Sequence, residues 1–205
     1  MESWADSAIE TAVRQAEAWF RALPEFKRRV NLGSVVGRRR PAILSEHDCV
    51  MNFARFLNEA GVAWDAIHHQ VSCSRWLFDG SHPAARAGLV GKKRWCADLG
   101  LVKTEDFLKA ELPAKLAGGF QFDAFLEFAY LSDFFTLPSV HPYGHPAKYR
   151  QKVSDDVAKI ASYLATSVCR SGYVVVFAEC DCEFPSGFQA DAEKKRCQVR
   201  FVRGY

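Results

Sequence analysis

The sequence contains no run of 18 apolar residues, so a transmembrane helix of ordinary length is not expected. Its first ten residues, MESWADSAIE, lack a basic leader followed by an apolar segment, and this argues against a secretory signal. The seven cysteines are an odd number, which is not typical of a complete disulfide framework. We therefore expect a cytoplasmic protein with reduced thiols and no membrane contact.

A large excess of charge of one sign is also missing. The formal net charge is +3, which by itself is too small to imply a nucleic-acid partner. The charge is nevertheless unevenly distributed, because seven basic residues and one acid, Glu25, lie between Arg21 and Arg40. Such a block often meets phosphate, although a solvated loop is the more common explanation. With 205 residues, 49% of them hydrophobic, the chain can bury the core of one folded domain.

Several familiar catalytic motifs are absent. The chain has no Walker A loop, no dinucleotide-binding glycine motif and no nucleophile-elbow serine. Cys49 would need a histidine beside it to act as a nucleophile, and His47 lies two residues away, where helix neighbours do not face each other. Zinc binding is an alternative for two clusters, although ordinary buried thiols would give the same pattern. These clusters are His68, His69 and Cys73, and Cys180, Cys182 and Cys197.

Hydrophobic periodicity predicts an α/β fold with a mixed central sheet and helices on both faces. The first two helices are predicted at 5–23 and from a Ser45 cap to Gly61. Strands are predicted at 62–73, 94–102, 121–131, 173–180 and 197–203. Two further helices are predicted at 104–117 and at 155–168, the latter capped by Ser154. Residues 132–152 are rich in proline and are predicted to form a long irregular segment.

Two carboxylates lie inside runs that otherwise read as buried strands, Asp98 in the second strand and Glu127 in the third. A buried carboxylate costs several kcal/mol unless something pairs with it. Two of them in neighbouring strands suggest a bound divalent metal ion, and the alternative is that they reach solvent at strand ends. Glu46 lies in the first turn of the second helix, where an acid serves either the helix dipole or a site.

This order of elements, with Glu46 on a helix and Asp98 and Glu127 on successive strands, resembles the PD-(D/E)XK nuclease superfamily. The resemblance implies a restriction-endonuclease-like αβββαβ core over roughly residues 45–181. Residues 1–44 would then be an N-terminal helix and basic linker, and 45–205 the nuclease-like domain. It implies that Asp98 and Glu127 bind Mg²⁺ or Mn²⁺, that Glu46 assists, and that the protein hydrolyses phosphodiester bonds in DNA.

The sequence departs from this pattern at Ala129, where the family has a lysine that assists the attacking water. Lys148 and Lys152 are free to reach the site from the irregular segment, and we predict Lys152 as the catalytic substitute. Lys159 lies about 200° from Val157 on the predicted helix, which points it away from the core. Since the motif lysine is missing, the alternative is a catalytically inactive nuclease fold that binds nucleic acid or a protein partner.

Two groups of basic residues are predicted to contact DNA phosphates. They are Arg38, Arg39 and Arg40 in the linker, and Lys92, Lys93 and Arg94 just before the strand that carries Asp98. Trp64, Trp76 and Trp95 could stack on bases, or could serve as core or partner-interface anchors. Asp123 shares the strand parity of Glu127 and is a candidate third acid. The predicted partners are DNA, another protein, or a second copy of the chain in a homodimer.

Overall fold

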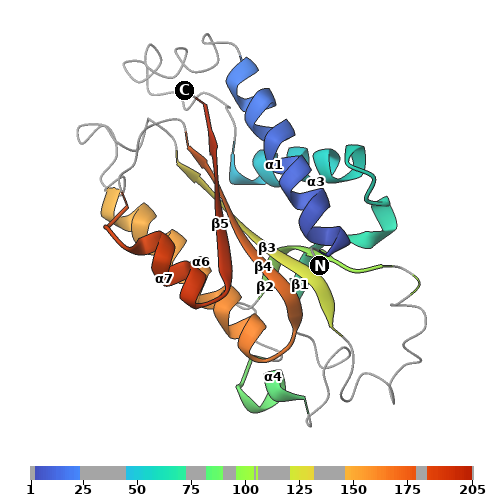
Figure 1. The fold of residues 1–205 in the computed structure, drawn as a ribbon, viewed down its shortest axis with the longest axis vertical. Helices are drawn as coiled ribbons and strands as arrows, with labels where there is room; N and C mark the ends of the chain where they lie inside the picture. Colours follow the sequence, from blue (N-terminus) through green and yellow to red (C-terminus); the bar gives the residue numbers. More distant parts are fainter. Residues whose placement is uncertain are drawn as a thin grey trace.

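The computed structural model describes residues 3–23, 45–72, 82–89, 96–103, 105, 121–131, 146–178 and 184–204 (Figure 1). Its helices are α1 (Trp4–Ala22), α3 (Glu46–Glu59), α4 (Pro83–Arg86), α6 (Pro146–Ala165) and α7 (Phe188–Lys194). A short 3₁₀ turn, η2, covers Trp64–Ala66. The strands are β1 (Ile67–Ser72), β2 (Cys96–Leu101), β3 (Phe122–Leu131), β4 (Cys169–Ala178) and β5 (Cys197–Arg203). Among these helices, none has the length and apolar character needed to span a bilayer.

The five strands form one sheet in the order β1-β2-β3-β4-β5. β1, β2 and β3 pair antiparallel, whereas β3, β4 and β5 pair parallel. β3 is the central strand and is buried along its whole length, as its nearly continuous apolar sequence predicts. The predicted α/β fold with a mixed sheet is therefore confirmed.

Helices cover both faces of this sheet, as predicted. α1 and α3 pack on one face around Phe53, Leu126 and Phe128, and α6 and α7 lie on the other (Figure 1). Beneath α6, Phe125 and Ala129 of β3 meet Val157 in a second core. Alternate residues of β3 thus serve opposite faces, and this parity places the side chain of Glu127 on the α6 face.

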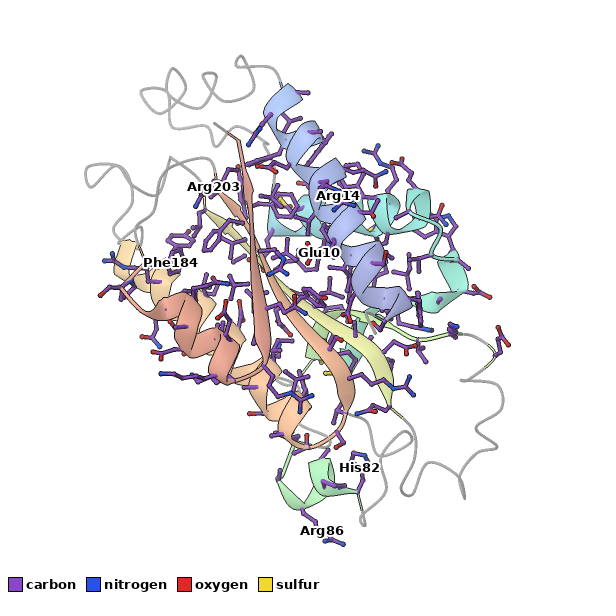
Figure 2. The ribbon with its side chains drawn as sticks, viewed as in Figure 1. Glu10, Arg14, His82, Arg86, Phe184 and Arg203 are labelled. Atoms are coloured by element: carbon purple, nitrogen blue, oxygen red, sulfur yellow. The ribbon has the colours of Figure 1, made fainter. Side chains whose placement is uncertain are left out.

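The second helix begins after the predicted cap Ser45, and the first begins at Trp4 after a cap, Ser3, that was not predicted. The side chain of Ser3 accepts a hydrogen bond from the N–H of Asp6, and Ser45 does the same for Asp48, each as part of a capping box. α1 is held to the sheet by an ion pair of 2.7 Å between Glu10, labelled in Figure 2, and Arg200. The predicted boundary at residue 44 lies outside the described residues.

Helix α6 differs most from its prediction. It begins at Pro146 rather than near residue 155, so the prediction that 146–152 are irregular is wrong. Proline is tolerated in the first turn of a helix, where its missing N–H breaks no hydrogen bond, and good helix formers follow it. Ser154 lies within the helix instead of capping it. As a consequence, Lys152 sits on the same rigid helix as Lys159.

Smaller differences occur at other element ends. β1 begins at Ile67, after the 3₁₀ turn, and β4 begins at Cys169, four residues before its prediction. The short helices α4 and α7 were not predicted. The predicted helix at 104–117 lies outside the described residues except for Glu105, which is helical.

Candidate active site

The site lies where β2 and β3 separate. Their antiparallel ladder ends with the pair Leu99 and Leu126, and the register continued by one residue puts Asp98 opposite Glu127. Opposed residues of an antiparallel pair point to the same face, so both carboxylates lie on the α6 side. The main-chain N–H of Phe128 donates a 2.9 Å hydrogen bond to Asp98 Oδ2. The side chain of Asp98 therefore spans the two strands where the ladder ends.

Asp98 also has a partner on β1. The β1–β2 register skips Gln70, whose φ of 51° lies in the left-handed region. Its Nε2 donates to Asp98 Oδ1 over 3.4 Å, so each carboxylate oxygen of Asp98 accepts one contact from a neighbouring strand. A non-glycine residue with positive φ stores local strain, and such residues cluster at functional sites. Gln70 was not predicted, since no sequence pattern marks the skipped pair.

Glu127 is the most deeply buried acid of the site, with 3% of the residue exposed. Lys159 Nζ lies 2.8 Å from Glu127 Oε1, an ion pair whose geometry falls short of a hydrogen bond. Burial raises the pKa of Glu127 to about 8; the charge of Lys159 opposes this rise and that of Asp98 adds to it. Because this carboxyl is poorly compensated by the protein, it can gain from a bound cation.

Three charged side chains of α6 form a stripe that faces these acids. Lys152, Asp156 and Lys159 are spaced by four and three residues, which places them on one side of the helix. Lys152 Nζ lies 3.0 Å from Asp156 Oδ2. Burial raises the pKa of Asp156, and the nearby lysines limit the rise. Asp156 was not predicted as a site residue, because the irregular segment expected before residue 155 concealed this periodicity.

Lys152 contacts three different elements. Its Nζ donates to the carbonyl oxygen of Phe128 over 2.7 Å and to Asp156 Oδ2 over 3.0 Å, and it pairs with Glu46 Oε2 over 3.1 Å. Burial works to lower the pKa of Lys152, but Asp156 and Glu46 together raise it above its ordinary value. The pKa of Glu46 is raised by burial and by the other acids, against the effect of Lys152. The ammonium group is therefore held charged among acids.

The structure thus gathers the four residues predicted as catalytic, Glu46, Asp98, Glu127 and Lys152. It does not bring Asp123 to them. Asp123 lies four residues before Glu127 on β3, about 13 Å along an extended strand. Its Oδ1 instead accepts a 3.2 Å hydrogen bond from Arg170, at the other end of the sheet. The proposal of Asp123 as a third acid of the site is therefore wrong.

The prediction that Lys159 points away from the core is also wrong. Val157, the reference used for that prediction, lies at one edge of the buried face of α6. The other edge is Tyr163, which is fully buried and lies four residues after Lys159, only about 40° around the helix. The long side chain of Lys159 therefore reaches from the border of the buried face to Glu127.

We call the place where the β2–β3 ladder ends, at Asp98 and Glu127, the β2–β3 fork. Its donors suit a divalent cation held by two protein ligands. Among the described residues, no three of the types His, Cys, Asp and Glu are placed to share a metal ion. Asp98 and Glu127 nevertheless offer hard oxygen donors from opposed positions, and Glu127 Oε1 lacks a hydrogen bond. Mg²⁺ is commonly held by one or two carboxylates, with water and phosphate oxygens completing the shell. The donor set suits Mg²⁺ or Mn²⁺ in this mode.

Other predicted site residues cannot be placed. The proposed DNA-contacting residues all lie outside the described part of the chain; they are Arg38, Arg39, Arg40, Lys92, Lys93 and Arg94. Of the two proposed zinc clusters, Cys73, Cys180 and Cys182 are likewise outside it. His68 and His69 are adjacent in β1 and therefore point to opposite faces of the sheet. Trp64 is 56% exposed in the 3₁₀ turn η2, which precedes the edge strand β1.

Comparisons of the chain with family models, with curated proteins and with solved structures found no match. Four acids, Glu46, Asp98, Glu127 and Asp156, gather around two ammonium groups, and once Glu127 has lost its proton the excess of negative charge favours an added cation.

Proposed function

We propose that this protein is a divalent-metal-dependent, nuclease-like hydrolase of phosphodiester bonds in DNA, built on a restriction-endonuclease-like core. The observation that carries the proposal is the opposition of Asp98 and Glu127 at the β2–β3 fork, with two lysines of α6 beside them. The element order α3, β1, β2, β3, α6, β4 supports it, because it follows the αβββαβ order of that family.

The missing motif lysine has a physical explanation under this proposal. Ala129 is fully buried under α6, next to Val157 in the core. A lysine at that position would have to place its ammonium among apolar side chains. Lys152 and Lys159 approach the same carboxylates from α6, so an ammonium can reach the site from the helix that covers Ala129.

Each residue has a defined task in the proposed reaction. A divalent cation held by Asp98 and Glu127 would lower the pKa of a bound water and neutralise charge on the scissile phosphate. Asp98 is oriented for this by Phe128 and Gln70. Glu127 has to lose its proton before it serves as a ligand, since the pKa of its carboxyl is about 8 without metal. An α6 lysine would stabilise the charge that develops on the phosphate, and Glu46 keeps Lys152 in place.

One observation favours a second function, a nuclease-like module that binds nucleic acid or a protein without cleaving it. The α6 ammonium groups already pair with Glu46, Asp156 and Glu127. Together with the lack of a three-ligand cluster in the described residues, this pairing would suit a site that has given up its metal. The two functions differ in one measurable property, turnover.

A plasmid-nicking assay separates them. The full-length protein is incubated with supercoiled DNA in Mg²⁺, in Mn²⁺ and in EDTA, together with Asp98→Asn and Glu127→Gln. Asp123→Asn is the matched control, because Asp123 lies buried on the same strand and face but is paired with Arg170. A nuclease nicks DNA in metal, loses nicking in both site variants and retains it in the control. A folded wild type that never nicks contradicts the hydrolase and favours the binding module.

A further inference from the structure

Lys152 and Lys159 of α6 differ in the number of oxygen atoms that their ammonium groups contact. A lysine ammonium has three N–H donors. Lys152 has three oxygen acceptors within 3.1 Å, the carbonyl of Phe128, Asp156 Oδ2 and Glu46 Oε2. Two of its donors make hydrogen bonds, to Phe128 and Asp156, and Glu46 is a further ion-pair partner. An additional phosphate or water oxygen at Lys152 would compete with these three partners.

Lys159 has one described acid within ion-pair distance, Glu127 Oε1 at 2.8 Å, and its side chain is 18% exposed, against 38% for Lys152. Because one carboxylate oxygen engages at most one or two donors, the ammonium of Lys159 retains capacity for an incoming anion. It also lies beside the acid that faces Asp98 across the fork. With fewer competing partners than Lys152, Lys159 is the better placed of the two lysines to meet a bound phosphate.

The partners of Lys152 belong to three elements, α3, β3 and α6. Glu46 begins α3, which packs on one face of the sheet, and Asp156 belongs to α6, on the other. Phe128 lies between them on β3, just beyond the last backbone pair with β2. Its ring meets Phe53 of α3 at a centroid distance of 5.2 Å, while its carbonyl is held by Lys152. Lys152 thus ties both helix layers to the residue that follows Glu127.

From these contacts we infer that Lys152 is a positioning residue that fixes Glu127 and Glu46 at the β2–β3 fork, and that Lys159 is the lysine that meets the substrate phosphate. The assignment to Lys159 rests on the proposed function, whereas the clamp made by Lys152 does not. Lys152 acts through the backbone of β3 and through the start of α3. Asp156 is its partner on α6 and shares the positioning role.

The clamp is tested first on stability, without any need for activity. Urea unfolding of the full chain is measured for Lys152→Met, Asp156→Asn and the double variant. If the clamp exists, Lys152→Met lowers the urea midpoint, and Asp156→Asn has a different effect in the Lys152→Met background than in the wild type. Lys159→Met is the matched control on the same helix face and should couple more weakly with Asp156→Asn, because the described ion pair of Asp156 is with Lys152. Strictly additive effects of Lys152→Met and Asp156→Asn would overturn the clamp.

The division between the lysines is tested by the Mg²⁺ dependence of nicking. A loosened fork weakens cation binding, so Lys152→Met should need several-fold more Mg²⁺ yet recover to within about tenfold of the wild-type rate at saturation. Lys159→Met should lose more than about a hundredfold in rate at every Mg²⁺ concentration. The reverse pattern, with Lys152→Met beyond rescue and Lys159→Met active, would overturn the assignment. A wild type that does not nick would reject the proposed function, while the urea measurements would still decide on the clamp.

Discussion

The main-chain N–H of Phe128 donates a 2.9 Å hydrogen bond to the carboxylate of Asp98. Asp98 lies one residue and Phe128 two residues beyond the last backbone pair of β2 and β3, Leu99 with Leu126. A side chain proposed to hold metal is therefore also part of the sheet. The contacts with Phe128 and Gln70 fix the orientation of the Asp98 carboxylate from within the sheet. Asp98→Ala should therefore lower stability, whereas Asp98→Asn should mainly weaken metal binding.

Asp98→Ala removes this hydrogen bond and leaves the N–H of Phe128 without its carboxylate partner. We expect a loss of about 1.5–3 kcal/mol in the free energy of unfolding, the usual range for hydrogen bonds to charged groups. Asp98→Asn retains an oxygen acceptor and should lose about 1 kcal/mol or less. Urea unfolding in EDTA measures both changes. Equal losses for the two variants would show that the contact with Phe128 contributes nothing.

The metal-free protein should lose stability as the pH rises from about 4.5 to about 8. Burial raises the pKa of Glu127 from 4.5 to about 8, so within this window the folded state binds more protons than the unfolded state. Glu46 and Asp156, whose pKa values are also raised, contribute with the same sign. Glu127→Gln should therefore flatten the decline and raise the melting temperature at pH 8 in EDTA. An unchanged slope in Glu127→Gln would contradict the burial effect.

Cation binding should release the proton that Glu127 carries in the metal-free protein. A metal ligand has to be deprotonated, so Mg²⁺ affinity should rise with pH until about 8 and then level off. Calorimetry in buffers of different ionisation enthalpy would detect the proton released on binding near pH 7. Affinity that is independent of pH between 6 and 8 would show that Glu127 is not a ligand.

The packing of α6 depends on Gly172 of β4. A Cβ at this position would lie 2.2 Å from Ile160 Cγ2 and 3.2 Å from Leu164 Cδ1, so a side chain there would push the helix away from the sheet. We expect Gly172→Ala to cost about 1–3 kcal/mol of unfolding free energy, the usual range for overpacking. It should also weaken the approach of Lys159 to Glu127, since Lys159 precedes Ile160.

The control for this prediction is a change in the opposing side chain. Ile160→Ala removes the atoms that a Cβ of residue 172 would meet, although alone it leaves a cavity. The double variant Gly172→Ala with Ile160→Ala should be more stable than the sum of the two losses implies. Thermal melts of the four proteins would reveal this, and simple additivity would contradict a steric contact at Gly172.

Much of the fold was accessible from sequence because local signals agreed with the final structure. The cap Ser45 marks the start of α3, and the apolar run of β3 marks a strand buried on both faces. The start of α6 was missed because Ser154 followed by two acids imitates a cap. In the structure these residues lie along one continuous helix.

The residues of the candidate site could be predicted only in part from the sequence, for a geometric reason. Asp98 and Glu127 stand out because each is a charge within an apolar strand. Asp156 and Lys159 sit on a helix where charged residues are ordinary, and only the extent of the buried face, which reaches to Tyr163, shows that they look inward. The contact of Gln70 with Asp98 arises because Gln70 has no partner in the β1–β2 register, and this register is a property of the assembled sheet.

The most direct test of the opposed carboxylates is a Mg²⁺ titration by calorimetry at pH 8, comparing wild type, Asp98→Asn, Glu127→Gln and Asp123→Asn. We predict one binding event in the wild type and in Asp123→Asn, and a loss of more than about tenfold in affinity in each of the other two, since changes around a ligand alone cost 10–100-fold. Equal binding by all four proteins, or none by a folded wild type, would contradict a metal site at Asp98 and Glu127.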